Sequence, residues 1–177
     1  MKKLTLLLMI ALISAMVSCS KSGSDVPDTP RTDVPSELRG NWMFGSFSMT
    51  EYWSQDPSEY LGPGVEIAFA FTFNADGTFT AYFTAGTVMN GVQTYQQSVS
   101  KGTVEVDAAN KVIKTHTSQV HYRRTVGGQV AEDRDMGKNE YDPNDSYTYT
   151  TGVEPGGTDA LYLTLEDTSE PLTFLRK

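Results

Sequence analysis

The side chains best suited to bind a metal or exchange protons are the two histidines, His116 and His121. Imidazole nitrogens are the commonest metal ligands among protein side chains. The two residues are five apart, and in one continuous strand an odd separation places them on opposite faces. They can share a metal ion only if a bulge intervenes. The spacing therefore favours two exposed polar residues and no metal site.

Other catalytic patterns are missing from the sequence. The serines include no Gly-x-Ser-x-Gly motif, and no spacing ties a histidine to a nucleophile. Glycoside hydrolysis needs two carboxylates facing each other across a cleft, and nothing in the sequence pairs Asp133 or Asp135 with such a partner. The acidic run 132–135 offers oxygen ligands for Ca²⁺ but lacks the spacing of a known loop. We expect a solvated loop there, no enzymatic activity and no cofactor.

The overall charge argues against nucleic acid as a partner. The 177 residues include 14 Lys+Arg and 22 Asp+Glu, which gives a net charge of −8 at pH 7. A body this acidic repels phosphate backbones. Its length is enough for one domain with its own core. The single cysteine excludes an internal disulfide framework and any cysteine-based metal site.

That single cysteine, Cys19, follows an export signal. Two lysines precede an apolar run over residues 4–17, which is too short to span a bilayer comfortably as a helix and fits the core of a signal peptide. The run ends in Ala-Met-Val-Ser-Cys, which resembles the bacterial lipobox. The resemblance implies a lipoprotein signal peptide over residues 1–18 and three acyl chains on Cys19. Cleavage would remove two of the 14 basic residues and lower the net charge to −10.

A polar segment follows the cysteine. Residues 20–35 contain three prolines and no hydrophobic periodicity, so they cannot bury a core and should stay extended. We expect a flexible tether over residues 19–35 and one domain over residues 36–177. Lipidated Cys19 would make the membrane a partner. The expected location is the cell envelope, at the outer membrane, with the leaflet left open.

The domain is predicted to be all-β. No amphipathic helix is evident after Asn41, and the chain holds 15 Gly, 9 Tyr and 8 Phe. Short strands separated by turn residues favour an antiparallel sandwich or barrel. Beyond the hairpin described next, strands are expected before and after a turn at residues 107–110 and at residues 147–151, 161–165 and 172–175. Residues 127–145 carry charges, Gly-Gly and Asp-Pro, and are expected to form a long loop. The total is eight or nine strands.

The clearest element is a hairpin over residues 65–85. Every odd position from Val65 to Phe73 is large and apolar, which is typical of a strand with one buried face. The turn Asn-Ala-Asp-Gly follows, with a glycine able to adopt positive φ. This turn places Phe73 opposite Phe79, Phe71 opposite Ala81 and Phe69 opposite Phe83, so turn and pattern agree on the register.

Three residues carry a resemblance to a known family. Gly40 and Trp42 form a Gly-x-Trp at the start of the first strand, and Arg176 lies near the end of the last. This arrangement resembles the lipocalin (calycin) family, in which the Trp closes one end of an up-and-down barrel and the Arg packs over it. The chain also contains, in order, a lipobox, a polar tether, Leu-x-Gly-x-Trp, Phe-x-Phe-Asn-x-Asp-Gly-Thr, Lys-Gly-Thr-Val and a final Tyr-Leu-Thr-Leu. This order is more closely similar to lipocalin-like lipoproteins of Bacteroidota, a group without an established activity. The resemblance covers residues 36–177.

Two alternatives are open for the barrel interior. An eight-stranded barrel either fills its centre with side chains or holds one small ligand. In the second case Phe69, Phe71, Phe83 and Trp42 would line the cavity, although Trp42 is expected mainly to plug the closed end. Tyr52, Trp53 and Tyr60, in or beside the loop over residues 55–64 at the open mouth, could stack on a sugar or a protein partner.

The resulting expectation is a membrane-anchored monomer that binds a small apolar or amphipathic ligand. The alternative is a filled barrel that acts as a protein- or glycan-interaction accessory of an outer-membrane complex. A closed core without a cavity of roughly 300 Å³ or more would exclude the first.

Overall fold

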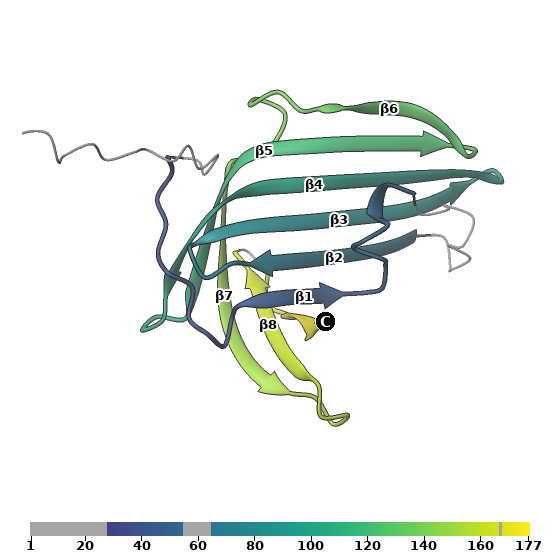
Figure 1. Cartoon of the computed structure of the whole chain (residues 1–177). Coiled ribbons are helices and arrows are strands. Elements are labelled where there is room, and N and C mark those ends of the chain that lie inside the picture. Colours follow the sequence, from purple (N-terminus) through teal and green to yellow (C-terminus); the bar gives the residue numbers. More distant parts are fainter. Residues whose placement is uncertain (1–27, 55–64, 167) are drawn as a thin grey trace, which may run out of the picture.

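A computed structural model describes residues 28–54, 65–166 and 168–177 (Figure 1). These residues form one 3-10 helix, η1 (Tyr52–Ser54), and nine strands: β1 (Gly40–Phe44), β2 (Val65–Phe73), β3 (Thr78–Met89), β4 (Val92–Asp107), β5 (Val112–Val126), β6 (Gln129–Asp135), β7 (Asn144–Val153), β8 (Asp159–Leu165) and β9 (Leu172–Arg176). Within the described ranges, no helix has the length and apolar character needed to cross a membrane.

The strands form a single antiparallel sheet that closes on itself. The order is β4-β3-β2-β1-β9-β8-β7-β5, and a further pairing between β4 and β5 completes a ring of eight strands. The ninth strand, β6, lies outside the ring and pairs only with the far part of β5. Figure 1 shows β2 to β6 side by side as one broad layer, with β7 and β8 running steeply to it. The expected all-β antiparallel barrel is confirmed.

The predicted β2–β3 hairpin is confirmed in its register. Phe73 lies opposite Phe79, Phe71 opposite Ala81, and Phe69 opposite Phe83. At the turn, Gly77 has φ of 78°, a conformation that only glycine adopts without strain. The alternation of large apolar and small residues therefore determines which face of β2 is buried.

One end of the ring is filled with side chains, and we call it the closed end. The turns β2–β3, β4–β5 and β7–β8 lie there, as does the start of β1. The buried cluster combines aromatic and aliphatic residues from nearly every strand of the ring: Trp42, Phe71, Phe73, Phe79, Ala81, Val104, Ile113, Tyr147, Tyr149, Leu161, Leu163 and Phe174, with Val34 and Leu38 beneath them. The opposite end, where β1 ends and β9 begins, is the open end.

The packing of residues 29–34 corrects the expected domain boundary. Val34 is 1% exposed and its amide donates to Ala75 O (3.2 Å). The amide of Thr32 donates to Val104 O (3.0 Å), and the hydroxyls of Thr29 and Thr103 are hydrogen-bonded (2.6 Å). The segment that was expected to remain a free tether up to residue 35 is therefore packed on β4 from about Thr29 onward.

Beyond the open end, the strands continue as an extension of the ring. We call this the flap and define it as residues 82–87 of β3, 94–99 of β4 and 121–126 of β5, which are aligned in register, together with β6. The long loop expected over residues 127–145 was wrong in this part, because β6 occupies residues 129–135. The charged side chains of β6 gave no strand pattern in the sequence, because a strand that is solvated on both faces shows no apolar alternation.

A β-bulge sets which side chains face which way on the flap. Lys101 lies opposite Gln119 and Gly102 opposite Thr117, so Ser118 has no partner residue on β4. A Cβ atom added at Gly102 would lie 2.0 Å from His116 O, so this approach requires glycine. The extra residue interrupts the alternation along β5. Odd-numbered side chains face inward before Ser118, and even-numbered side chains face inward after it.

Candidate functional site

An apolar cavity lies at the open end of the ring. Its volume is about 210 Å³, and its walls are almost free of polar atoms. The lining comes from β1, β2, β3, β7, β8 and β9: Phe44, Ile67, Phe69, Phe71, Phe83, Tyr147, Leu163, Leu165, Leu172 and Phe174. Inward-facing side chains of six neighbouring strands thus converge on one space.

The floor and the rim of this cavity differ in burial. On the floor, Phe71 is 1% exposed and packs at 5.7 Å, between ring centroids, from Phe174. Phe69 packs edge-on against Phe71 (4.8 Å). On the rim, Ile67 is 53% exposed and Leu165 is 39% exposed. The cavity is therefore open to solvent through an apolar rim.

The volume limits what the cavity can hold. Pockets that enclose a drug-sized molecule measure roughly 300–1,000 Å³, so about 210 Å³ is too small for such a ligand to be enclosed. A dry apolar cavity of roughly 150 Å³ already binds benzene. The space fits one ring or a short hydrocarbon chain. It falls below the 300 Å³ that would favour a carrier enclosing its whole ligand.

The wall of the cavity continues onto the flap. Phe83 lies opposite Ser98, Ser98 opposite Tyr122, and Tyr122 opposite Arg134. Residues directly opposite each other in an antiparallel sheet share a face. Phe83 lines the cavity, so the other three project on the same side, which we call the inner face of the flap. The character of this face changes from apolar to polar along four strands.

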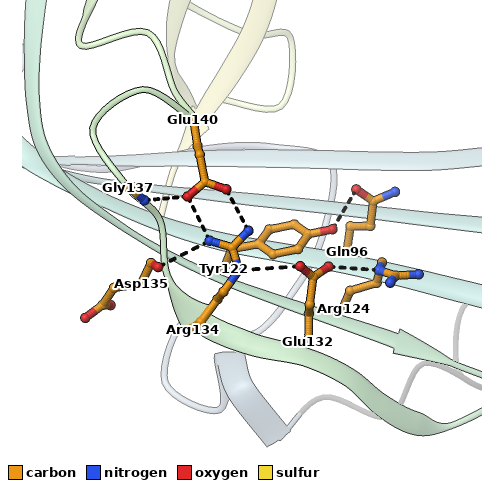
Figure 2. Close-up of polar contacts among 8 residues, drawn as sticks. All are labelled: Gln96, Tyr122, Arg124, Glu132, Arg134, Asp135, Gly137 and Glu140. Carbon is orange, nitrogen blue, oxygen red and sulfur yellow. Dashed lines mark hydrogen bonds and ion pairs between the residues drawn. The ribbon is translucent and has the colours of Figure 1, made fainter.

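Polar side chains of the inner face form two hydrogen-bonded groups, the Tyr122–Gln96 pair and a chain from Arg124 through Glu132 to Arg134, which we call the network (Figure 2). The Tyr122 hydroxyl donates to Gln96 Oε1 (3.2 Å). Arg124 Nε donates to Glu132 Oε2 (3.2 Å), and Arg134 Nε donates to the other oxygen of Glu132 (3.4 Å). Burial raises the pKa of Tyr122, so it remains a protonated donor at neutral pH.

The network ends on the loop after β6. Arg134 donates two hydrogen bonds to Glu140 (2.9 and 2.8 Å), and the Gly137 amide adds a third (2.6 Å). Bidentate pairing of this kind fixes geometry as well as charge. The guanidinium of Arg134, followed by the Gly137 amide, lowers the pKa of Glu140. Two arginines and two glutamates balance one another, so the inner face is polar without a net charge.

The structure brings three of the predicted ligand-binding residues together and places two others away from them. Phe69, Phe71 and Phe83 line the cavity. Tyr52 and Trp53 do not, because they lie on the opposite face of the sheet. Tyr60 lies outside the described residues, as does Cys19.

Tyr52 was expected to be exposed, and this was wrong. It is 3% exposed and packs against Tyr82 (5.2 Å between ring centroids). Its hydroxyl lies 3.0 Å from both the carbonyl oxygen and the amide nitrogen of Ser98 and also contacts Phe83 O. Burial raises the pKa of Tyr52. The sequence around Tyr52 gave no indication that this segment folds over the outer face of β3 and β4.

Trp42 lies at the closed end, away from the cavity. It is 1% exposed, and its Nε1 donates to Leu38 O (2.7 Å). The Arg176 guanidinium lies over the Trp42 ring at 4.2 Å from its centroid and donates to Arg39 O (2.7 Å) and Glu37 O (2.9 Å). A Cβ atom at Gly40 would lie 3.3 Å from Arg176 Nη1. These three residues form a structural closure.

Both histidines form hydrogen bonds with side chains of this protein, and most of their partners are acidic. His116 contacts Glu105 Oε2 (2.8 Å) and Asn144 Oδ1 (2.7 Å). His121 contacts Asp133 and Asp135. The bulge places both histidines on the outer face, because His116 lies opposite Thr103 and His121 opposite Val99, an even separation on β4. In the part of the chain that the structure describes, no group of three or more such side chains could hold a metal ion.

Several lining residues were not predicted as ligand-binding. Leu163 and Leu165 share one face of β8, and Leu172 and Phe174 share one face of β9. The period-2 alternation identified these faces as buried, but only strand order shows that they join the aromatic face of β2. The polar inner face had no sequence signal, because it depends on the register of β6.

No protein-family model, no curated protein and no solved structure matches this chain.

Proposed function

We propose that this protein binds a small amphipathic molecule, with its apolar end in the open-end cavity and its polar part along the inner face of the flap. The observation that supports the proposal is that the apolar wall and the polar inner face form one continuous surface. Phe83 of the wall lies in one row of directly paired residues with Ser98, Tyr122 and Arg134. A ligand lying across this boundary meets surfaces that match both of its halves.

The energetics favour partial insertion. Burying apolar surface contributes about 25 cal/mol per Å², and the walls offer almost no polar atoms that would lose water. A cavity of about 210 Å³ takes one ring or a short chain, not a whole lipid. The rest of the ligand must stay outside, where Gln96, Tyr122 and Arg124 provide hydrogen-bonding groups.

The experiment compares three probes by isothermal titration calorimetry: toluene, n-octyl-β-glucoside below its micellar concentration, and glucose. Octyl glucoside should bind more tightly than toluene, since it contacts both surfaces, and glucose should not bind measurably. Failure of both toluene and octyl glucoside to bind would contradict the proposal. Binding of glucose as tight as that of octyl glucoside would instead favour a glycan-interaction module.

A cavity-filling variant locates the binding. Leu172→Trp places a larger side chain in the cavity and should weaken octyl glucoside binding at least about tenfold, because displaced ligand carbons lose their burial. Val88→Trp is the matched control, since Val88 is 51% exposed at the β3–β4 tip and does not line the cavity. Equal weakening by both variants would contradict this location.

The second candidate is an interaction module without a small ligand. Its support is that the closed half of the ring is filled and that Ile67 and Leu165 form an exposed apolar rim. Native mass spectrometry of protein purified from its own host distinguishes the two candidates. Added mass that disappears in Leu172→Trp supports ligand binding, whereas a co-purifying protein lost on Ile67→Ser supports the module.

We also propose that the chain is anchored to the outer membrane of the cell envelope through acylated Cys19. The support is the lipobox-like sequence ending at Cys19 and the firm anchoring that multiple acyl chains provide. Cys19→Ala should move the protein from the membrane fraction to the soluble fraction, whereas Ser20→Ala should not. Membrane association of Cys19→Ala equal to that of the unaltered chain would contradict the anchor.

A further inference from the structure

His121 is held between two carboxylates on the outer face of the flap. Its Nδ1 lies 2.8 Å from Asp135 Oδ1, and its Nε2 lies 2.9 Å from Asp133 Oδ1. Both aspartates belong to β6, and Asp135 lies directly opposite His121 in the register. The bulge at Ser118 gives His121 this orientation.

Only one protonation state satisfies both contacts. A neutral imidazole carries a single N–H, so one of its nitrogens would present a lone pair to a carboxylate oxygen. The imidazolium donates from both nitrogens, and each charge-assisted hydrogen bond is stronger than a neutral one. The geometry is therefore that of a charged histidine bridging two anions.

The same ring also supports η1. The Trp53 ring packs edge-on against the His121 ring, with 4.9 Å between centroids. The next outward residue on β5, Arg123, donates to Trp53 O and lies 3.8 Å from Asp133 Oδ2. Within the described ranges, the charged groups that face His121 are Asp133 and Asp135, with Arg123 beside Asp133. Strand β4 contributes Val99 opposite it.

We propose that His121 is a proton-dependent attachment point, which holds β6 and η1 on β5 while it is charged and loosens both when it loses its proton. β6 depends on such contacts because it pairs with one strand only. On the inner face it has the Glu132–Arg124 pair, and on the outer face it has His121 and Arg123. Loss of the proton leaves one aspartate facing a lone pair.

The direction of the pH dependence follows from linkage. The hydrogen bond to Asp135, and then that to Asp133, raise the pKa of His121 above the ordinary value of 6.5, although partial burial opposes them. A raised pKa in the attached state means that the stabilisation is fully present below the unfolded value and is lost as the pH rises through the folded value. The attachment should weaken toward mildly alkaline pH.

Nuclear magnetic resonance can test this directly, because the chain has only two histidines. The His121 ring signals should titrate with a midpoint above 6.5, and Asp135→Asn should lower that midpoint more than Asp133→Asn. Amide hydrogen exchange of β6, referenced to the β2–β3 hairpin, should accelerate above the midpoint. The expected factor is about tenfold for each unit by which the attached-state midpoint exceeds that of the opened state.

Matched variants distinguish the proposed role of His121 from a general destabilisation of the fold at alkaline pH. His121→Gln should remove the pH dependence of β6 exchange, and His116→Gln should retain it. A His121 midpoint at or below 6.5 would overturn the proposal. So would β6 exchange that keeps its pH dependence in His121→Gln, or that follows the reference hairpin at every pH.

Discussion

The closed and open ends of the ring are built from the same strands but differ in how deeply their apolar side chains are buried. At the closed end, Trp42 is 1% exposed, its indole nitrogen is hydrogen-bonded and Arg176 covers its face. At the open end, Ile67 is 53% exposed beside a cavity of about 210 Å³. The residue types do not explain this contrast, since both ends are rich in phenylalanine and leucine.

The difference arises from what lies beyond each end. At the closed end, residues 29–38 fold back and contribute Val34 and Leu38 to the core. At the open end, β1 and β9 stop while β3, β4 and β5 continue into the flap. Strands that diverge leave their inward side chains without partners across the ring. Packing therefore fills the ring at one end, and incomplete packing at the other end leaves the cavity in which we propose that a ligand binds.

The largest effect should come from the closed end. Trp42→Ala removes a fully buried aromatic side chain and should lower the free energy of unfolding by about 3–5 kcal/mol. Urea unfolding followed by circular dichroism measures this loss. Val88→Ala, at an exposed tip, should cost less than about 0.5 kcal/mol. A loss below about 1 kcal/mol for Trp42→Ala would remove the distinction between the two ends.

An intermediate effect is expected for the residue that covers Trp42. Arg176→Ala removes hydrogen bonds to two carbonyl oxygens and a cation–π contact, and should cost about 1–2 kcal/mol. Arg176→Lys keeps the charge but loses the planar fork that reaches both carbonyls, so it should recover only part of the loss. Full recovery in Arg176→Lys, measured by the same unfolding curves, would show that charge alone matters there.

The smallest effect on stability is expected at the open end. Ile67→Ala should change the free energy of unfolding by less than about 1 kcal/mol, because about half of the side chain is already exposed. It should nevertheless weaken octyl glucoside binding several-fold in calorimetry, since Ile67 lines the cavity. If Ile67→Ala lowered the free energy of unfolding as much as Arg176→Ala and left binding unchanged, the open end would serve stability in the way the closed end does.

The sequence was informative where a single strand face had to be buried. The alternation over residues 65–73 and the turn ending at Gly77 determine both the hairpin and its register, because a slip of one residue would turn the three phenylalanines of β2 to the other face. The β8–β9 pair was found for the same reason, whereas the hairpin at residues 107–110 was found from its turn residues, since the alternation after Lys111 is poor. These are local patterns, and they were sufficient to predict the fold class.

The features that were missed depend on contacts between distant segments. The burial of Tyr52 depends on the path of residues 45–54 over β3 and β4, and the packing of Val34 depends on Ala75. β6 carries charges on both faces and is recognisable only beside β5. The cavity itself is set by where strands end, which local alternation does not specify.

The extra residue at Ser118 has an evolutionary consequence. The bulge absorbs it, so deleting Ser118 would give plain alternation along β5 while residues 119–126 kept their present partners on β4 and their present faces. These residues would exchange faces only if Ser118 paired with Lys101 in place of the bulge, which would turn His121 to the inner face and Tyr122 to the outer face. In a lineage of such barrels, the gain or loss of one codon at this bulge would therefore leave the chemistry of both surfaces unchanged.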